Sequence, residues 1–275
     1  MGPAVELYLD LMKRCLTRLI FIDQEHNRVR LNAAGWKGVP RRALAAALRR
    51  ARVDLVHATP ANVDKRLVGR DWPQNAETMV GLARLDNIQQ CVEDVLANDV
   101  PGDLIETGVW RGGSSIFMRA ILAAHGDPTR VVWLADSFRG LPPPNAEKYP
   151  ADAGKDLYKH AALAVSVDEV RRNFERYGLL DERVRFLVGW FSDTLPTAPI
   201  DRLAVVRLDG DLYESTMDAI SALYPKLSVG GYLIVDDYGA IEACRLAVHD
   251  YRDAHGITDE IISVDGIGVY WKRSS

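Results

Sequence analysis

Four aspartates occur at two places where an apolar run of the chain ends. Asp209 and Asp211 close the run in "VRLDGDLYEST", and Asp236 and Asp237 close the run in "YLIVDDYG". A buried carboxylate without a counter-charge is very costly, so these side chains must be solvated, paired with cationic side chains, or bound to a cation. Carboxylate oxygens are the ligands that Mg²⁺ prefers, and three of them leave positions open for substrate oxygens and water. We therefore interpret Asp209, Asp236 and Asp237 as ligands of Mg²⁺.

The same aspartates also fit a structural role. An aspartate is a good N-cap for a helix that follows a strand, and Arg207 and Arg245 lie in the same segments and could form ion pairs with these acids. Gly210 separates Asp209 from Asp211 and allows the chain to turn there. The two carboxylates can therefore be aimed differently, although residues two apart on a strand normally share a face.

A glycine-rich stretch, "LIETGVWRGGSS", passes from an apolar run into a helical pattern at residues 104–115. Its glycines allow the backbone to pass close to a ligand, and Ser114 or Ser115 can cap the helix. The spacing differs from the G-x-G-x-x-G fingerprint of pyrophosphate-binding proteins, and the P-loop lysine is missing. Glu106, shortly before the first glycine, would also repel a pyrophosphate. These features favour a cationic, phosphate-free ligand such as S-adenosylmethionine, with a purely structural turn as the alternative.

The next two apolar runs add residues for the same ligand. "VVWLADS" brings Asp136 to the position at which doubly wound nucleotide-binding folds place the acid that bonds ribose hydroxyls. A later run ends in Gly189, Trp190, Phe191 and Ser192, whose aromatic side chains could flank an adenine ring. Core packing explains these aromatic residues almost as well. Together with the glycine-rich stretch, Asp136 strengthens the prediction of a nucleoside-type ligand.

These residues need a fold that gathers strand ends at one edge. From Gly102 onward, short apolar runs alternate with helical patterns, which predicts an α/β fold with a doubly wound, Rossmann-like parallel sheet. In such sheets ligands bind at the carboxyl ends of the strands, where the motifs lie. Residues 257–273 predict two further strands joined by a tight turn at Asp265 and Gly266, so an antiparallel strand closes the sheet.

The first part of the chain has a different pattern. Its periodicity is helical at residues 5–20, 41–52 and 76–97, so we predict a helical cap or interface region over residues 1–97 and a cofactor-binding core over residues 98–275. The segment 41–52 is basic on one face and rich in Ala and Leu on the other, which favours a solvated amphipathic helix over a site for an acidic partner. Helices of this kind predict a homodimer or higher homo-oligomer, although helices that cap the cofactor site would look the same.

A stretch rich in proline and glycine, "RGLPPPNAEKYPADAGKD", predicts a long loop within residues 139–165. It follows the strand that ends at Asp136, so it is a candidate lid, and a surface excursion without a role is the alternative. His160 lies within it. His160, His125 and His249 are rival candidates for a general base, but we expect each to be a solvated or core histidine, with His160 held in reserve.

Composition limits the classes of function. A chain of 275 residues with 48% hydrophobic and 26% charged residues can bury a full core, and a net charge of -4 gives no general reason to bind nucleic acid or an anionic membrane. Cys15, Cys91 and Cys244 are far apart, which fits neither a disulfide framework nor paired zinc ligands. With no apolar stretch of membrane-spanning length and no pattern of an export signal, we expect a cytoplasmic protein without a membrane partner.

Four separated motifs carry a resemblance to a known family. "ETGVWRGGSS", "ADSFRGLPPP", "LDGDLYEST" and "GGYLIVDDYG" occur in the order and with the spacing of the macrocin O-methyltransferase family, whose members methylate deoxysugar hydroxyls on macrolides, aminocoumarins and related natural products. The resemblance runs from about Arg70, through "GRDWPQNAETMVGLARLDNIQQC", to the end of the sequence. Residues before Arg70 match less well.

The resemblance implies a class I methyltransferase that uses S-adenosylmethionine and an essential Mg²⁺ held by Asp209, Asp236 and Asp237. In this family the acid two residues after the first metal ligand is the general base, and that position is Asp211 here. The implied partner is a small-molecule glycoside that accepts the methyl group. The motifs and the resemblance together predict a cofactor site made by Thr78, Met79, Glu106, Thr107, Gly108, Ser114, Asp136, Ser137, Gly189, Trp190, Phe191, Ser192 and Asp209.

Two other functions fit the same motifs. A catechol or small-phenol O-methyltransferase also combines this fold with Mg²⁺, and a non-catalytic S-adenosylmethionine-binding protein would keep the cofactor site. The four aspartates argue against the second alternative. The aglycone and the methylated sugar hydroxyl are left open by the sequence.

Overall fold

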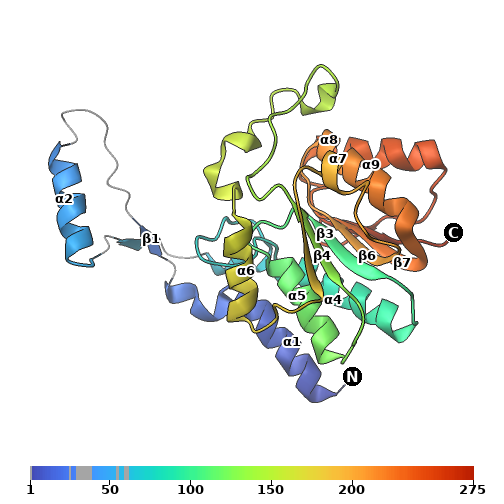
Figure 1. Ribbon diagram of the computed structural model, residues 1–275, viewed down its shortest axis with the longest axis horizontal. Helices are drawn as coiled ribbons and strands as arrows, with labels where there is room; N and C mark the ends of the chain where they lie inside the picture. The colour runs from blue at the N-terminus through green and yellow to red at the C-terminus, as the bar shows by residue number, and fades with distance from the viewer. Residues whose placement is uncertain (1, 25, 29–38, 54–55, 59–61) are drawn as a thin grey trace.

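A seven-stranded sheet lies at the centre of the computed structural model, which describes residues 2–24, 26–28, 39–53, 56–58 and 62–275 (Figure 1). The strands, in spatial order, are β5 Val184–Val188, β4 Val132–Asp136, β3 Asp103–Thr107, β6 Leu203–Leu208, β7 Leu227–Val235, β9 Val269–Lys272 and β8 Ile262–Ser263. The first five are parallel, and β9 pairs antiparallel with β7. The order reverses between β3 and β6, which is the switch point at which such sheets bind ligands. The predicted doubly wound sheet with an antiparallel C-terminal strand is confirmed.

Helices cover both faces of the sheet (Figure 1). The described helices are α1 Pro3–Leu16, α2 Val39–Arg50, α3 Val63–Leu67, α4 Leu82–Ala97, α5 Gly113–Ala124, α6 Val167–Arg176, α7 Phe191–Thr194, α8 Tyr213–Leu223 and α9 Glu242–His255, with short 3-10 turns at Leu19–Gln24, Pro150–Asp152, Leu157–Lys159, Ala161–Leu163 and Tyr224–Lys226. All but α2 lie close to the main sheet or to its covering helices (Figure 1). None of these described helices has the length and apolar composition that a membrane crossing requires.

Successive strand residues are buried on opposite faces. Leu104 of β3 packs in the core that includes α1, α4 and α5, whereas Ile105 packs in the core that includes α8 and α9, and both are fully buried. This arrangement explains why the strand sequences are apolar without alternation.

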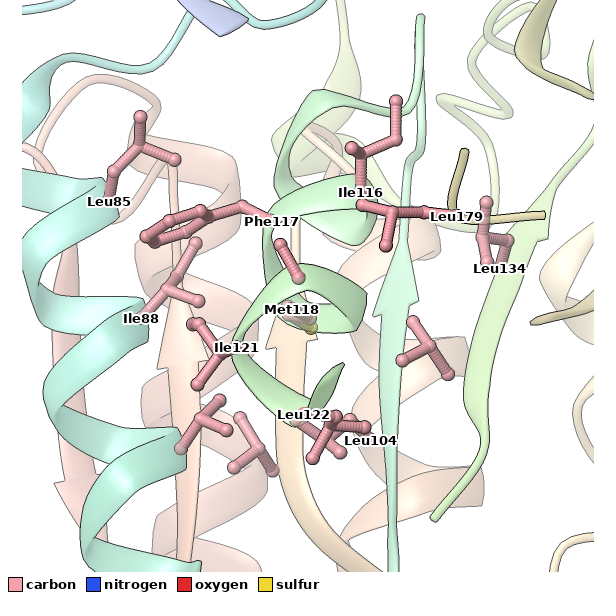
Figure 2. Close-up of a cluster of buried hydrophobic side chains, with 14 of the residues drawn as sticks. Leu85, Ile88, Leu104, Ile116, Phe117, Met118, Ile121, Leu122, Leu134 and Leu179 are labelled. Carbon is pink, nitrogen blue, oxygen red and sulfur yellow. The ribbon is translucent and has the colours of Figure 1, made fainter. Parts of the chain in front are cut away.

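Figure 2 shows part of the first core, in which Leu85 and Ile88 of α4 meet Phe117 and Ile121 of α5. Each side chain is at most 1% exposed. Full burial of one such side chain stabilises the fold by about 1.5–3 kcal/mol. The packing fixes α5, and therefore the glycine-rich turn at its start, against the sheet.

The N-terminal helices share this core. Leu9, Met12 and Leu16 of α1 are buried in the cluster that contains Leu104. The helix predicted at 5–20 is present, but it ends at Leu16 with Thr17 as its C-cap, so its predicted end was wrong. The division of the chain at residue 97 stays a prediction.

The helix predicted from residue 76 begins only at Leu82, with Gly81 as its N-cap, so that boundary was wrong. The preceding backbone is used in tertiary hydrogen bonds: Glu77 N–H donates to the Leu16 carbonyl, and Gly113 N–H donates to the Glu77 carbonyl. These bonds hold the segment before α4 between the end of α1 and the start of α5. Helical periodicity alone does not reveal them.

Not all of the predicted N-terminal cap packs near the sheet as α1 and α4 do. The helix α2 confirms the segment predicted at 41–52 and stands apart from the sheet, and Leu44 on it is 47% exposed (Figure 1). A two-stranded antiparallel sheet of β1 His26–Arg28 and β2 Val56–Ala58 was not predicted. The rest of the predicted N-terminal cap, at residues 25, 29–38, 54–55 and 59–61, lies outside the described residues.

The turn predicted at Asp265 and Gly266 is longer than a two-residue hairpin. It spans residues 264–268 between β8 and β9, with Gly266 at a φ of 82°. The Asp265 carboxylate accepts hydrogen bonds from the N–H groups of Ile267 and Gly268. The aspartate therefore organises an extended loop in place of the tight turn that its sequence favours.

Candidate active site

A cavity of about 350 Å³ opens at the carboxyl ends of the parallel strands. The glycine-rich loop after β3, the ends of β4, β5 and β6, and the start of α8 all contribute to its wall. Its lining residues are Met79, Gly108, Trp110, Asp136, Ser137, Gly140, Leu141, Pro142, Pro143, Asn145, Leu163, Gly189, Trp190, Phe191, Ser192, Asp209, Gly210, Asp211, Glu214, Ser215 and Asp218. The cavity lies where the sheet topology predicts a ligand site.

Three of the four aspartates converge beside this cavity, whose lining includes Asp209 but neither Asp236 nor Asp237. Backbone hydrogen bonds continue past the strand ends, because Asp209 N–H donates to the Thr107 carbonyl and Asp236 N–H donates to the Leu208 carbonyl, each at 2.9 Å. As a result, one carboxylate oxygen from each of Asp209, Asp236 and Asp237 lies within 4.8 Å of the others. The predicted set of metal ligands is therefore brought together.

The electrostatics of this cluster fit a divalent cation. Asp237 Oδ2 is buried and accepts no hydrogen bond. Burial and the neighbouring carboxylates, Asp211 and Asp209 foremost, raise the pKa of Asp237 well above its ordinary value, and burial and Asp236 raise the pKa of Asp209. A bound cation would satisfy the free oxygen and favour the ionised forms.

Two arginines already touch the cluster. Arg207 donates to Asp209 Oδ2 at 2.8 Å and to Asp236 Oδ1 at 2.5 Å, and Arg84 donates to Asp236 Oδ2 at 2.5 Å. The alternative that these aspartates form ion pairs is therefore partly confirmed, because Arg207 pairs with Asp209 and Asp236. Arg245 instead pairs with Glu242, 3.4 Å away.

Asp211 lines the cavity together with Asp209 but is not part of the three-aspartate cluster. Its φ of 60° places it in the left-handed region. Burial and the charges of Asp209 and Asp236 raise the pKa of Asp211 to about 8. A carboxyl group with a pKa near neutrality is well suited to accept a proton.

The glycine-rich loop needs its first glycine for close approach. Gly108 has a φ of 83°, and a Cβ there would lie 1.7 Å from the Asp209 carbonyl oxygen. The predicted serine cap of the following helix was wrong: Gly112, in the left-handed region, is the N-cap of α5, and Ser115 donates a hydrogen bond to Glu106 instead. Ser114 is buried inside the first turn of α5.

The two predicted cofactor acids have different surroundings. Glu106 is almost fully buried, accepts a hydrogen bond from Arg207 at 2.6 Å and does not line the cavity. Burial raises its pKa to about 7. Asp136 does line the cavity, and it accepts hydrogen bonds from the N–H groups of Val109 and Phe138, each at 2.7 Å. Asp136 thus ties the glycine-rich loop to the end of β4.

Some of the other predicted cofactor residues line the cavity, and others do not. Met79, Ser137 and the aromatic segment at 189–192 line the cavity, as do Gly108 and Asp209. Thr78, Thr107 and Ser114 are buried and lie behind the lining. The cavity wall also contains residues that the sequence did not single out, namely Leu141, Asn145, Leu163, Glu214 and Asp218. The sequence offered one hint for three of these residues. Leu141 and Asn145 lie in the predicted loop, and Leu163 lies shortly after its proline-rich part.

The segment 139–165 forms one wall of the cavity and is held by contacts with several parts of the chain. Trp110 Nε1 donates to the Ala162 carbonyl at 2.8 Å. The fully buried carboxylate of Asp152 accepts hydrogen bonds from Tyr213 N–H and Glu214 N–H at the start of α8. Whether the segment moves as a lid stays a prediction.

The three histidines lie outside the cavity lining. His125 lies 3.1 Å from Glu93, and His249 lies 2.7 Å from the Tyr238 hydroxyl. His160 is exposed and meets the ring of Trp72 edge to face at 5.6 Å.

Comparisons with known proteins identify a family and several similar chains. A family model described as macrocin-O-methyltransferase (TylF) matches residues 5–273. A Streptomyces olivaceus protein named 8-demethyl-8-(2,3-dimethoxy-alpha-L-rhamnosyl)-tetracenomycin-C 4'-O-methyltransferase is 55% identical over 273 residues, which cover 99% of this chain and 94% of that protein. A Streptomyces niveus protein named demethyldecarbamoylnovobiocin O-methyltransferase is 61% identical over 207 residues, covering 75% and 79%. The solved structure of the O-methyltransferase NovP is similar with a TM-score of 0.85 and 50% identity, covering 98% of this chain and 100% of that one.

Proposed function

The chain belongs to the macrocin-O-methyltransferase (TylF) family and is an O-methyltransferase, and from this premise we propose that it methylates a sugar hydroxyl of a glycosylated natural product, with S-adenosylmethionine and Mg²⁺. One observation carries the proposal. Three aspartates cluster at the carboxyl edge of the sheet, and a fourth with a raised pKa faces the adjoining cavity.

The methyltransferase fold implies S-adenosylmethionine as the methyl donor. The supporting features are the close-approach glycine Gly108, the strand-end acid Asp136 and the aromatic segment at 189–192, all of which line one cavity. Asp136 accepts two short hydrogen bonds from the N–H groups of Val109 and Phe138 and two longer ones, from Trp110 N–H at 3.4 Å and the Ser137 hydroxyl at 3.5 Å. Ribose hydroxyls can replace the two longer and weaker contacts. The nearby negative charges suit a ligand that carries an ammonium and a sulfonium.

The proposed Mg²⁺ ligands are Asp209, Asp236 and Asp237, whose oxygens fit a hard cation in number, type and spacing. A divalent cation in this position supplies positive charge that lowers the pKa of a nearby acceptor hydroxyl. Asp237 has a buried oxygen without a hydrogen-bond partner, and Arg207 bonds only one oxygen of Asp209, so both side chains would have an oxygen available for the cation.

Asp211 is the proposed general base. An alcohol is a poor nucleophile until its proton leaves, and Asp211 lines the cavity beside the aspartate cluster. Its backbone is in the left-handed region, and its carboxylate is near enough to the cluster to be affected by the charges of Asp209 and Asp236 while it is not one of the three clustered ligands. The acceptor proton therefore goes to the Asp211 carboxylate as the methyl group is transferred.

The cavity wall supports a sugar as the acceptor. Asn145, Ser192, Glu214 and Asp218 offer polar groups for hydroxyls, and Leu141 together with neighbouring prolines offers an apolar surface. The name of the Streptomyces olivaceus relative specifies a rhamnosyl unit, which supports a deoxysugar for this chain too. A homo-oligomer and a cytoplasmic location also stay proposals; the exposure of Leu7, at 72% on α1, supports a partner for that helix.

Mass spectrometry of an acceptor panel tests the proposal. The panel contains rhamnose- and noviose-type glycosides, a rhamnoside already methylated at the 2- and 3-hydroxyls, and catechol, each incubated with S-adenosylmethionine and Mg²⁺. We expect one added methyl group on a glycoside and none with the Asp211→Asn variant. If catechol is the only acceptor methylated, the proposed acceptor becomes a small phenol. Binding of the cofactor without methylation of any acceptor would contradict the proposed enzymatic function.

A further inference from the structure

Arg207 is a cation in an otherwise apolar strand. All six residues of β6 are buried, and the Arg207 side chain is only 1% exposed. Burial of a guanidinium is costly unless it is paired. Its partners come from three strands: Glu106 at the end of β3, Asp209 just after β6, and Asp236 just after β7, at 2.6, 2.8 and 2.5 Å.

Arg84 reaches the same cluster from α4. It donates to Asp236 Oδ2 at 2.5 Å and to Asp265 Oδ2 at 3.0 Å, and its side chain is 8% exposed. Gly268 packs against the aliphatic part of Arg84, since a Cβ at Gly268 would lie 2.9 Å from it. Both oxygens of Asp236 are therefore held, one by each arginine.

These contacts constrain the orientation of two carboxylates. Each carboxylate oxygen has two lone-pair directions, so a hydrogen bond from an arginine leaves a second direction available to a cation. Arg207 holds one oxygen of Asp209 and one of Asp236, which removes most of their freedom to rotate. Arg207 Nη1 donates to Glu106 Oε1 as well as to Asp209 Oδ2, so the same nitrogen also neutralises this third carboxylate, which is not part of the cluster.

Charge alone would make these arginines unfavourable for metal binding. A guanidinium in contact with two carboxylates repels a second cation that approaches them. If charge were the whole effect, removal of the arginine would tighten metal binding. A benefit to the metal site must therefore come from geometry, and the two explanations predict opposite signs.

We infer that Arg207 and Arg84 are positioning residues that hold Asp236 and Asp209 in the orientation needed to bind the divalent cation. The inference rests on the proposed Mg²⁺ site and adds two residues to it. The planar guanidinium of Arg207 offers donors to three carboxylates at once, which a lysine ammonium on a different stem cannot reproduce. Arginine, and not positive charge in general, is therefore required.

Metal titrations of the full chain test this inference. Mn²⁺ binding is followed by the loss of the free-ion electron paramagnetic resonance signal, and Mg²⁺ binding by calorimetry, for wild type, Arg207→Lys, Arg207→Met and Arg84→Lys. Loss of groups that orient metal ligands typically weakens metal binding about 10–100-fold. We expect a weakening in this range for both Arg207 variants and a smaller one for Arg84→Lys, which loses contact with Asp236 alone among the proposed ligands.

Arg119→Lys is the matched control. Arg119 is also buried and pairs with a single acid, Asp181, away from the cluster. We expect its metal affinity to equal that of wild type, and we expect Arg84→Lys to keep wild-type affinity for S-adenosylmethionine, because Arg84 does not line the cavity.

The outcomes separate the inference from the proposed site. Wild type that binds neither ion would contradict the metal site itself. If wild type binds the metal ions and both Arg207→Lys and Arg84→Lys bind them with the same affinity as wild type, only the positioning role is overturned. Tighter metal binding by Arg207→Met than by wild type would overturn it as well. If the Arg207 variants do not fold, Arg84→Lys decides alone: unchanged metal affinity overturns the role, and weakened affinity supports it.

Discussion

The carboxyl edge of the sheet carries acids on both sides of the switch point, and the two sides satisfy them differently. On the side of β3 and β4, Asp136 accepts hydrogen bonds from the N–H groups of Val109 and Phe138. Glu106 accepts a hydrogen bond from Ser115 and is paired with an arginine. These acids hold the glycine-rich loop and its surroundings in place.

On the side of β6 and β7, acid oxygens remain to be satisfied. Asp237 has a buried oxygen without a hydrogen-bond donor, and Asp211 has a pKa raised to about 8. The difference teaches that a carboxylate at a strand end is not a ligand by position alone. Its neighbours decide whether it holds the scaffold, binds a cation or takes a proton.

The largest expected effect is on kcat, when the proposed general base Asp211 is replaced. Asp211→Asn removes a proton acceptor while keeping the size of the side chain, so kcat should fall roughly 10²–10⁴-fold with near-native affinity for S-adenosylmethionine and Mg²⁺. Steady-state kinetics and calorimetry measure both quantities. Retention of most of the kcat, or recovery in excess Mg²⁺, would move the base elsewhere, with His160 tested next.

The next effect concerns the metal ligands. Asp209→Asn, Asp236→Asn and Asp237→Asn each remove a charged oxygen, so the Mg²⁺ concentration for half-maximal activity should rise by about tenfold or more. Asp193→Asn changes an acid outside the cluster and serves as the control. If all three variants need the same Mg²⁺ concentration as wild type, these aspartates are not the metal ligands.

A smaller effect is expected on the scaffold side. Asp136→Ala should weaken S-adenosylmethionine binding by about 1.5–3 kcal/mol, the usual range for a hydrogen bond to a charged group. The variant loses an acceptor for the ribose and also frees the N–H group of Val109. Calorimetric titration of the cofactor measures the change. Native affinity would remove Asp136 from the cofactor site.

The smallest expected effect is on how the thermal stability of the metal-free protein depends on pH. The folded-state pKa of Asp211, about 8, exceeds its unfolded value near 4, so the folded state binds the proton more tightly over this range. The stabilisation is complete below pH 4 and is lost as pH rises toward 8. In chelator, the melting temperature of wild type relative to Asp211→Asn should therefore fall by a few degrees between pH 5 and 8. A constant difference would show that Asp211 has an ordinary pKa.

The sequence predicted the parts of this edge that depend on local chemistry. Runs such as "LAVVRLDG" are apolar on both faces, which predicted buried parallel strands and placed Asp209 at a strand end. Gly210 predicted that Asp209 and Asp211 could be aimed apart. The three-aspartate cluster followed from strand-end geometry, since neighbouring parallel strands end at one edge.

Tertiary partners could not be predicted in this way. Arg84 meets Asp236 from 152 residues away, and Asp152 binds the start of α8 across a long segment. Gly112 replaces the predicted serine cap because Ser115 bonds Glu106 across the turn. The sequence did indicate that Arg207 could pair with the strand-end aspartates, and it pairs with Asp209 and Asp236, but its third partner, Glu106, was not predicted.

The most direct test of the central claim is the dependence of methyl transfer on a divalent cation. Activity toward the accepted glycoside is measured before and after treatment with EDTA, and again after Mg²⁺ is added in excess. If the acids beside β6 and β7 hold the cation, activity vanishes in the chelator and returns with Mg²⁺. Full activity in EDTA would contradict the account.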